Sequence, residues 1–156
     1  YPHNNTECQA ARLDNGSIML NCRNESSEKF RTVIVPSDLG KTWQSHPTSD
    51  HTLIEPGCNG SLYRFEWLRE DKTQSLFVFA NPHSQAGRTH HTIQVSFDDG
   101  RSWPKTYHLL LDAGRGNGYP SMTRIDDAHV GIVYEGSQAH LVFERLSLHE
   151  LLKRRQ

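Results

Sequence analysis

Three groups of residues in this 156-residue chain have types and spacings that could carry chemistry. The run 114–118 (GRGNG) has the glycines of a phosphate loop, but it leads into Tyr-Pro and an expected strand rather than a helix N-terminus. His83, His90 and His91 are metal-ligand types, yet neighbouring histidines on a strand point to opposite faces. The segment 45–50 contains Ser, His and Asp without the elbow that exposes a nucleophilic serine. We therefore expect no metal, no cofactor and no hydrolase triad.

Composition excludes further classes. The chain has 17 Lys and Arg against 18 Asp and Glu, a formal net charge of -1, which gives no reason to expect nucleic acid as a partner. No apolar run approaches the ~18 residues of a membrane span. The length fits one domain. Cys8, Cys22 and Cys58 form neither a disulfide framework nor a zinc spacing, so we expect mainly free thiols.

The elements that must position any site are short strands separated by turns. Asn15-Gly16 lies between two apolar runs, which is a strong hairpin signal. Only 147–156 has a helical pattern, with Ser147 as its N-cap. The other expected strands are 17–23, 31–36, 61–67, 75–81, 91–97, 106–111, 120–125, 129–135 and 140–146. Many short strands at regular spacing predict an antiparallel all-β protein.

One turn figure, D-x-G-x-[S/T]-W, occurs twice. Its Asp can accept backbone N–H groups, its Gly can take a positive φ, and its Trp can pack beneath the turn. A repeated self-contained turn indicates a repeated unit, hence radial blades, and a structural rather than catalytic role. The residues are Asp38, Gly40, Thr42 and Trp43 in the first copy and Asp98, Gly100, Ser102 and Trp103 in the second.

The figure resembles the Asp-box (BNR repeat) of sialidases, S-x-D-x-G-x-[T/S]-W. The second copy matches in full from Ser96, whereas the first has Pro36 in place of Ser. Three longer segments resemble sialidase segments in the family's order: NNTECQAARLDNGSIMLNCRN, NPHSQAGRTHHTIQVSFDDGRSWP and GNGYPSMTRIDDAHVGIVYEG. The resemblance covers essentially the whole chain.

The resemblance implies fold, activity and substrates. Residues 1–156 would form roughly the C-terminal half of a six-bladed β-propeller with Asp-box hairpins and a short C-terminal helix. The family activity is that of an exo-α-sialidase, a retaining glycosidase that releases terminal sialic acid from glycoproteins, glycolipids such as gangliosides, and oligosaccharides. Family members are secreted or periplasmic, or lysosomal and membrane-associated in eukaryotes.

The resemblance also assigns the site. Arg23 and Arg88 would be two of three arginines that bind the substrate carboxylate, because a guanidinium offers two parallel N–H donors to such an anion. Tyr119 would be the nucleophile and Glu7 its base. Glu135 would orient the first of the family's three arginines.

That arginine, from an R-I-P segment, and the acid/base Asp after it have no match in the chain. We therefore expect an inactive fragment whose partner is the missing N-terminal half. Arg64, Arg115 and Arg124 match no family position and are expected to be structural. Two alternatives remain: a non-catalytic Asp-box propeller that binds glycans or proteins, and a trans-sialidase or anhydro-forming activity in the same family.

Overall fold

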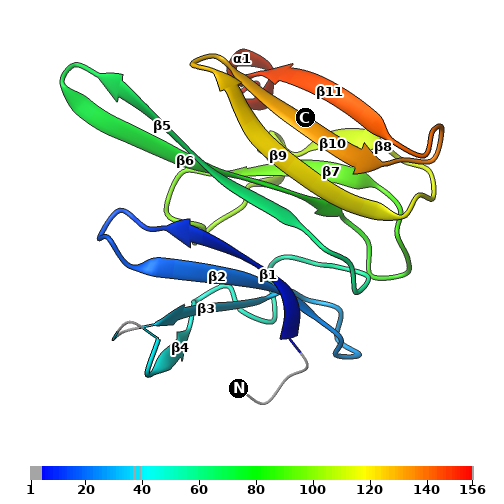
Figure 1. Cartoon of the computed structure of the whole chain (residues 1–156), viewed down its shortest axis with the longest axis horizontal. Coiled ribbons are helices and arrows are strands. Elements are labelled where there is room, and N and C mark those ends of the chain that lie inside the picture. The colour runs from blue at the N-terminus through cyan, green and yellow to red at the C-terminus, as the bar shows by residue number, and fades with distance from the viewer. Residues whose placement is uncertain (1–4, 37, 39, 156) are drawn as a thin grey trace.

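The computed structural model describes residues 5–36, 38 and 40–155. They form three antiparallel sheets and one short α-helix (Figure 1). The elements are β1 (Asn5–Arg12), β2 (Ile18–Asn24), β3 (Thr32–Pro36), β4 (Trp43–Ser45), β5 (Ser61–Arg69), β6 (Lys72–Pro82), β7 (His91–Ser96), the 3₁₀ turn η1 (Lys105–Tyr107), β8 (Leu109–Asp112), β9 (Gly118–Asp126), β10 (His129–Glu135), β11 (Val142–Ser147) and α1 (Leu148–Leu151).

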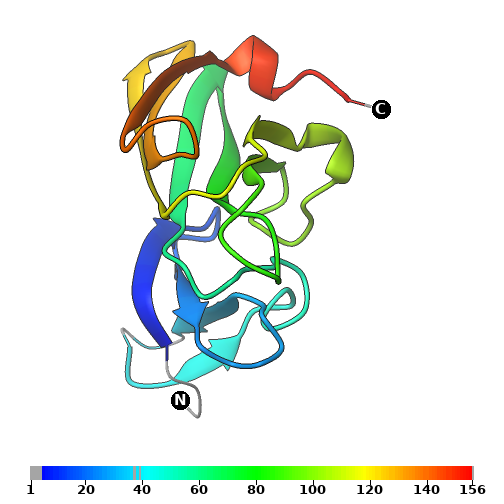
Figure 2. The same cartoon turned by 90° about the vertical axis from the view of Figure 1, so that its right-hand side faces the viewer.

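Each sheet is a meander of strands in chain order. The orders are β1-β2-β3-β4, β5-β6-β7-β8 and β9-β10-β11, and each pair is antiparallel. The first strand of each sheet contacts the first strand of the next, since β1 contacts β5 and β5 contacts β9. The sheets therefore stand beside one another along the chain, as blades would (Figures 1 and 2).

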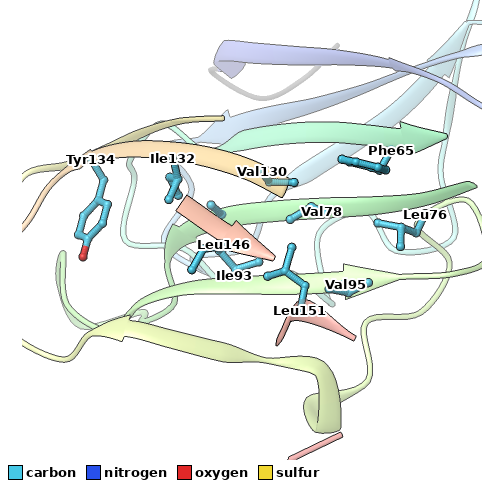
Figure 3. Close-up of a cluster of buried hydrophobic side chains, with 11 residues drawn as sticks. Phe65, Leu76, Val78, Ile93, Val95, Val130, Ile132, Tyr134, Leu146 and Leu151 are labelled. Carbon is cyan, nitrogen blue, oxygen red and sulfur yellow. The ribbon is translucent and has the colours of Figure 1, made fainter. Parts of the chain in front are cut away.

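The second sheet is covered on both faces, so its central strand β6 is apolar without alternation. Leu76 and Val78 point toward β10, β11 and α1, where the larger buried cluster lies (Figure 3). Phe77 and Phe79 point the other way, into a second cluster with residues of the first sheet. Because successive side chains of a strand face opposite sides, one strand contributes to both cores.

The second repeated turn is a tight clasp after β7. The Asp98 carboxylate accepts the Ser102 N–H at 2.9 Å and the Ser102 hydroxyl at 2.6 Å. Gly100 has φ +76°, and its carbonyl accepts the Trp103 indole N–H at 3.0 Å. Trp103 is 8% exposed and packs edge-on against Phe79. This turn has the expected structural role.

The first repeated turn differs at its tryptophan. The Thr42 N–H donates to Asp38 at 2.5 Å, and Gly40 has φ +92°, as the figure requires. Trp43 Cζ2 would lie 3.6 Å from a Cβ at Gly40, much as Trp103 lies against Gly100, but the Trp43 ring is 40% exposed. Its strand β4 is exposed throughout and lies at the edge of its sheet, so no described element covers the ring.

Two element boundaries were predicted wrongly. The helix expected over 147–156 spans only Leu148–Leu151, although the Ser147 hydroxyl does cap it by accepting the Glu150 N–H. The strand expected over 106–111 begins instead as η1, because Tyr107 N–H bonds Pro104 O and closes a turn. Local backbone hydrogen bonds decide both ends.

All three cysteines are free thiols, with Cys8 exposed and the other two buried. In the described part of the chain, no helix is both long and apolar enough to cross a membrane.

Buried histidines make the stability of this fold depend on pH. Burial lowers the pKa of His83 to about 4, and the charges of His108 and Lys105 act in the same direction. Its ring packs edge-on against His108, 5.1 Å between centroids, and burial lowers the His108 pKa as well. Unfolded histidine titrates near ~6.5, so between these pH values the unfolded chain binds more protons than the folded chain.

Stability should therefore fall as the pH is lowered from 7 to 5. We expect His83 to account for about 1–2 kcal/mol of that loss, less than the full shift implies because the ring is only half-buried. Urea unfolding at both pH values measures it. His83→Gln should flatten the pH dependence, and an unchanged slope in that variant would contradict the assignment.

Candidate functional site

Glu7 and Arg23 meet across the first hairpin. Thr6 pairs with Arg23, and a register shift between Thr6 and Gln9 leaves Glu7 in an irregularity with φ +45°. Glu7 Oε2 lies 2.9 Å from Arg23 Nη1. The bulge thus turns the Glu7 carboxylate toward the Arg23 guanidinium. Bulges commonly redirect a side chain in this way.

Arg23 is held by a second carboxylate as well. Its Nε lies 2.5 Å from Glu25 Oε1 in a second ion pair. Burial disfavours the charge of Arg23, but Glu7 and Glu25 outweigh it and raise the Arg23 pKa. The side chain is 17% exposed, so one guanidinium stays charged at a mostly covered position.

Arg88 and Tyr119 form the second half of the site. Arg88, in the loop between β6 and β7, donates to Asn117 O at 3.1 Å and to Gly57 O at 3.3 Å. Its guanidinium carbon lies 5.2 Å from the centre of the Tyr119 ring. Two carbonyls from two different loops therefore orient the guanidinium over the phenol.

Tyr119 has a backbone conformation that few non-glycine residues adopt. Its φ is +47°, and that of the preceding Gly118 is +89°. A Cβ at Gly118 would lie 2.8 Å from Cys58 Sγ and 2.9 Å from Pro82 Cγ. The turn into β9 thus requires glycine, and it leaves the Tyr119 side chain 39% exposed. Such strained positions concentrate at functional sites.

Cys58 joins the two halves. It is fully buried, and its thiol donates to Asn117 O at 3.4 Å. Burial raises the pKa of Cys58, while the Tyr119 backbone N–H opposes the rise. The charges of Arg88 and Arg23 lower this pKa and that of Glu7 raises it. The four predicted site residues, Glu7, Arg23, Arg88 and Tyr119, are therefore all near enough to influence one thiol, and we call them the Cys58 cluster.

Glu135 is the fifth predicted site residue. It pairs with Gly118 in the β9–β10 ladder, which places it beside the Tyr119 turn. Together with Arg88 and Asn117 it lines a hollow of about 650 Å³. Among the contacts of the described residues there is no Glu7–Tyr119 hydrogen bond, so the role of Glu7 as base stays a prediction.

An ion pair that sequence reasoning did not predict lies beneath the site. Arg31 and Glu55 are both fully buried, and Arg31 Nη1 lies 2.9 Å from Glu55 Oε2. Arg31 also donates to Cys58 O at 2.8 Å and to Asn21 Oδ1 at 2.7 Å. Burial raises the pKa of Glu55, against the opposing charge of Arg31. No local spacing relates these positions, because only the fold brings them together.

No family model matches the chain. It is 37% identical to a sialidase of Bacteroides fragilis over 96% of the chain, and 29% identical to a sialidase of Micromonospora viridifaciens over 83%. This chain belongs to the sialidase family. It spans about a quarter of the length of these relatives, 27% and 20% respectively.

Solved sialidase structures agree. The Hadza microbial sialidase Hz136 superimposes with a TM-score of 0.83 at 40% identity, over 94% of this chain and 28% of that one. An intramolecular trans-sialidase from Ruminococcus gnavus superimposes with a TM-score of 0.73 over 99% of this chain and 34% of that one, at 18% identity, and therefore shows the fold alone. The expected all-β fold, a partial propeller, is confirmed.

Removing one partner of the buried ion pair should be costly in this sialidase chain. Arg31→Met leaves Glu55 buried without its countercharge, and we expect a loss of about 3–5 kcal/mol in the free energy of unfolding. Arg31→Met/Glu55→Gln removes both charges and keeps an acceptor for the Asn24 N–H, so most of the loss should be recovered. Urea unfolding measures both, and a double variant no more stable than the single would refute this account.

The Gly118 turn should tolerate no side chain. Gly118→Ala meets Cys58 and Pro82, whereas Gly16→Ala, also at positive φ (+84°), meets nothing within 4 Å. The control should therefore lose only the free energy needed to hold an alanine at positive φ, about 1 kcal/mol. Gly118→Ala should lose about 1–3 kcal/mol more than the control. Equal losses in the two variants, measured by thermal and urea unfolding, would show that the contacts at Gly118 are not tight.

Proposed function

We propose that this chain supplies most of the catalytic residues of an exo-α-sialidase, which releases terminal sialic acid from glycoproteins, glycolipids and oligosaccharides. The observation that carries the proposal is the Cys58 cluster, in which a Glu7–Arg23 ion pair and an Arg88–Tyr119 contact both lie near one thiol. Sialidase relatives support the same activity. Since the chain spans only part of those relatives, the activity belongs to the whole protein.

The substrate carboxylate is bound by Arg23 and Arg88. Sialic acid carries this anion on its anomeric carbon, and planar guanidinium groups bind carboxylates through paired N–H donors. Arg88 is oriented by two carbonyls and Arg23 by two carboxylates, so both are pre-organised. Pre-organised donors need no rearrangement when the substrate arrives.

Tyr119 attacks the anomeric carbon, and Glu7 takes its proton. A carboxylate nucleophile would approach a carbon that already bears a carboxylate, and like charges repel strongly where water is excluded. A neutral phenol avoids that repulsion until its proton leaves. Water then hydrolyses the tyrosyl–sugar bond, so the anomeric configuration is retained.

Two groups that the family uses have no match in these 156 residues. We propose that the acid/base Asp and the first arginine come from an N-terminal half of the same propeller, and that Glu135 orients that arginine. The isolated chain should therefore show no turnover.

Substitution of Tyr119 tests the mechanism. In the chain joined to its N-terminal half, Tyr119→Phe should remove most turnover of a fluorogenic sialoside, and Glu7→Gln should reduce it by about 10²–10⁴-fold. Tyr107→Phe is the matched control, because Tyr107 packs against Phe97 away from the cluster. Full activity of Tyr119→Phe would exclude it as nucleophile, and turnover by the isolated chain would show that the missing groups are not needed. Product analysis separates hydrolysis from trans-sialidase chemistry.

A further inference from the structure

The loop between β8 and β9, residues 113–117, holds Arg88 and leads directly into the Tyr119 turn. The Gly116 N–H donates to Arg88 O at 3.1 Å, and Asn117 O accepts Arg88 Nη1 at 3.1 Å. Tyr119 follows Asn117 by two residues. The 113–117 loop therefore sets where the guanidinium of Arg88 lies relative to the phenol.

One carboxylate, that of Asp112 at the end of β8, fastens this loop to the turn after β10. It accepts the Gly114 N–H at 2.8 Å from within the loop. From the turn it accepts the Ser137 N–H at 2.6 Å and the Ser137 hydroxyl at 2.7 Å. The donors of Ser137, together with that of Gly114, hold the pKa of Asp112 below its usual range, so the carboxylate stays charged and keeps all three bonds.

The loop and the turn pack backbone against backbone at this point. A Cβ at Gly114 would overlap the Ser137 side chain, and a Cβ at Gly116 would lie 2.7 Å from the carbonyl carbon of Gly136. A Cβ at Gly136 would in turn lie 3.0 Å from the Asp112 carboxylate. Since no side chain of these glycines separates the two segments, a shift of the turn moves the loop with it.

Asp112 thereby links two sheets beside the site. It ends the outer strand of the second sheet, which carries Arg88 in its β6–β7 loop. Ser137 follows β10 of the third sheet, whose strand β9 begins at the Tyr119 turn. In the proposed mechanism Arg88 holds the substrate carboxylate, and Tyr119 attacks the carbon that bears it. Because the rate of attack depends steeply on the placement of the reacting groups, a contact that fixes these two residues relative to each other affects kcat.

We propose that Asp112 is a positioning residue for this reaction, which acts through the 113–117 loop and fixes Tyr119 relative to Arg88. The inference rests on the proposed sialidase function. The bond from Arg88 to Gly57 O and the ion pairs of Arg23 do not pass through this loop. Loss of Asp112 should therefore impair the attack more than the binding of the substrate.

Substitution of Asp112 in the chain joined to its N-terminal half tests this role. Asp112→Ala should lower kcat for a fluorogenic sialoside about 10–10²-fold, as a misplacement of about 1 Å does, and change KM less than about threefold. Asp112→Asn should recover most of kcat, because its amide oxygen can still accept the Gly114 N–H and the Ser137 hydroxyl. Ser137→Ala removes one of the three bonds and should lower kcat less than Asp112→Ala does.

Asp126 provides the matched control. It ends β9 as Asp112 ends β8, and it likewise accepts the backbone N–H two residues further on, that of Ala128, at 2.8 Å. It also hydrogen-bonds one side chain of β10 and one of β11, at the end of β9 opposite Tyr119. Asp126→Ala should lower the midpoint of thermal unfolding, as Asp112→Ala does, and leave kcat unchanged.

The outcomes separate this inference from the proposed function. Unchanged kcat in Asp112→Ala, or an equal loss of kcat in Asp112→Ala and Asp126→Ala, would overturn the positioning role while the activity of the unsubstituted protein stands. A higher KM at unchanged kcat would overturn it as well. If Asp112→Ala does not fold, Ser137→Ala decides: a lower kcat at unchanged KM supports the role, and full activity overturns it. If the unsubstituted protein turns over no sialoside, the proposed function itself is wrong.

Discussion

The buried ion pair between Arg31 and Glu55 underlies the whole candidate site. Neither side chain is exposed, and the guanidinium also bonds Asn21 of β2 and the carbonyl of Cys58, and lies over the ring of Phe79 in the second sheet. One charged group thus ties the first sheet to the loop that underlies the site. Because a buried charge is tolerated only with its partners in place, the pair demands one arrangement of these segments.

The site can keep a strained backbone because this ion pair fixes the segments beneath it. Glu7, Gly118 and Tyr119 all have positive φ, and each lies where a side chain must leave the ordinary path of a strand. Backbone conformations of this kind persist only where the surroundings over-determine them. Here the surroundings are the Cys58 thiol and the carbonyls of its loop, which the ion pair holds.

The cluster depends on three sheets rather than on any one. Glu7 and Arg23 come from the first sheet, Arg88 from a loop of the second, and Tyr119 from the first strand of the third. Strand β1 contacts β5, and β5 contacts β9, so the three sheets converge along these strands. The register of its strands fixes where each residue of a β-sheet lies, and a bulge can then redirect a single side chain. The same convergence puts the Arg115 guanidinium against Gly87, the residue before Arg88.

The sequence by itself determined the all-β class, most strands and the family, because alternation, turn residues and a repeated hairpin figure are local signals. It also named the cluster residues, through resemblance rather than through spacing. Only the tertiary structure decided that Trp43 stays exposed, that the C-terminal helix is a single turn, and that Arg31 meets Glu55. Those outcomes depend on which segments cover one another, and contacts between residues far apart in the chain leave no periodic trace in it.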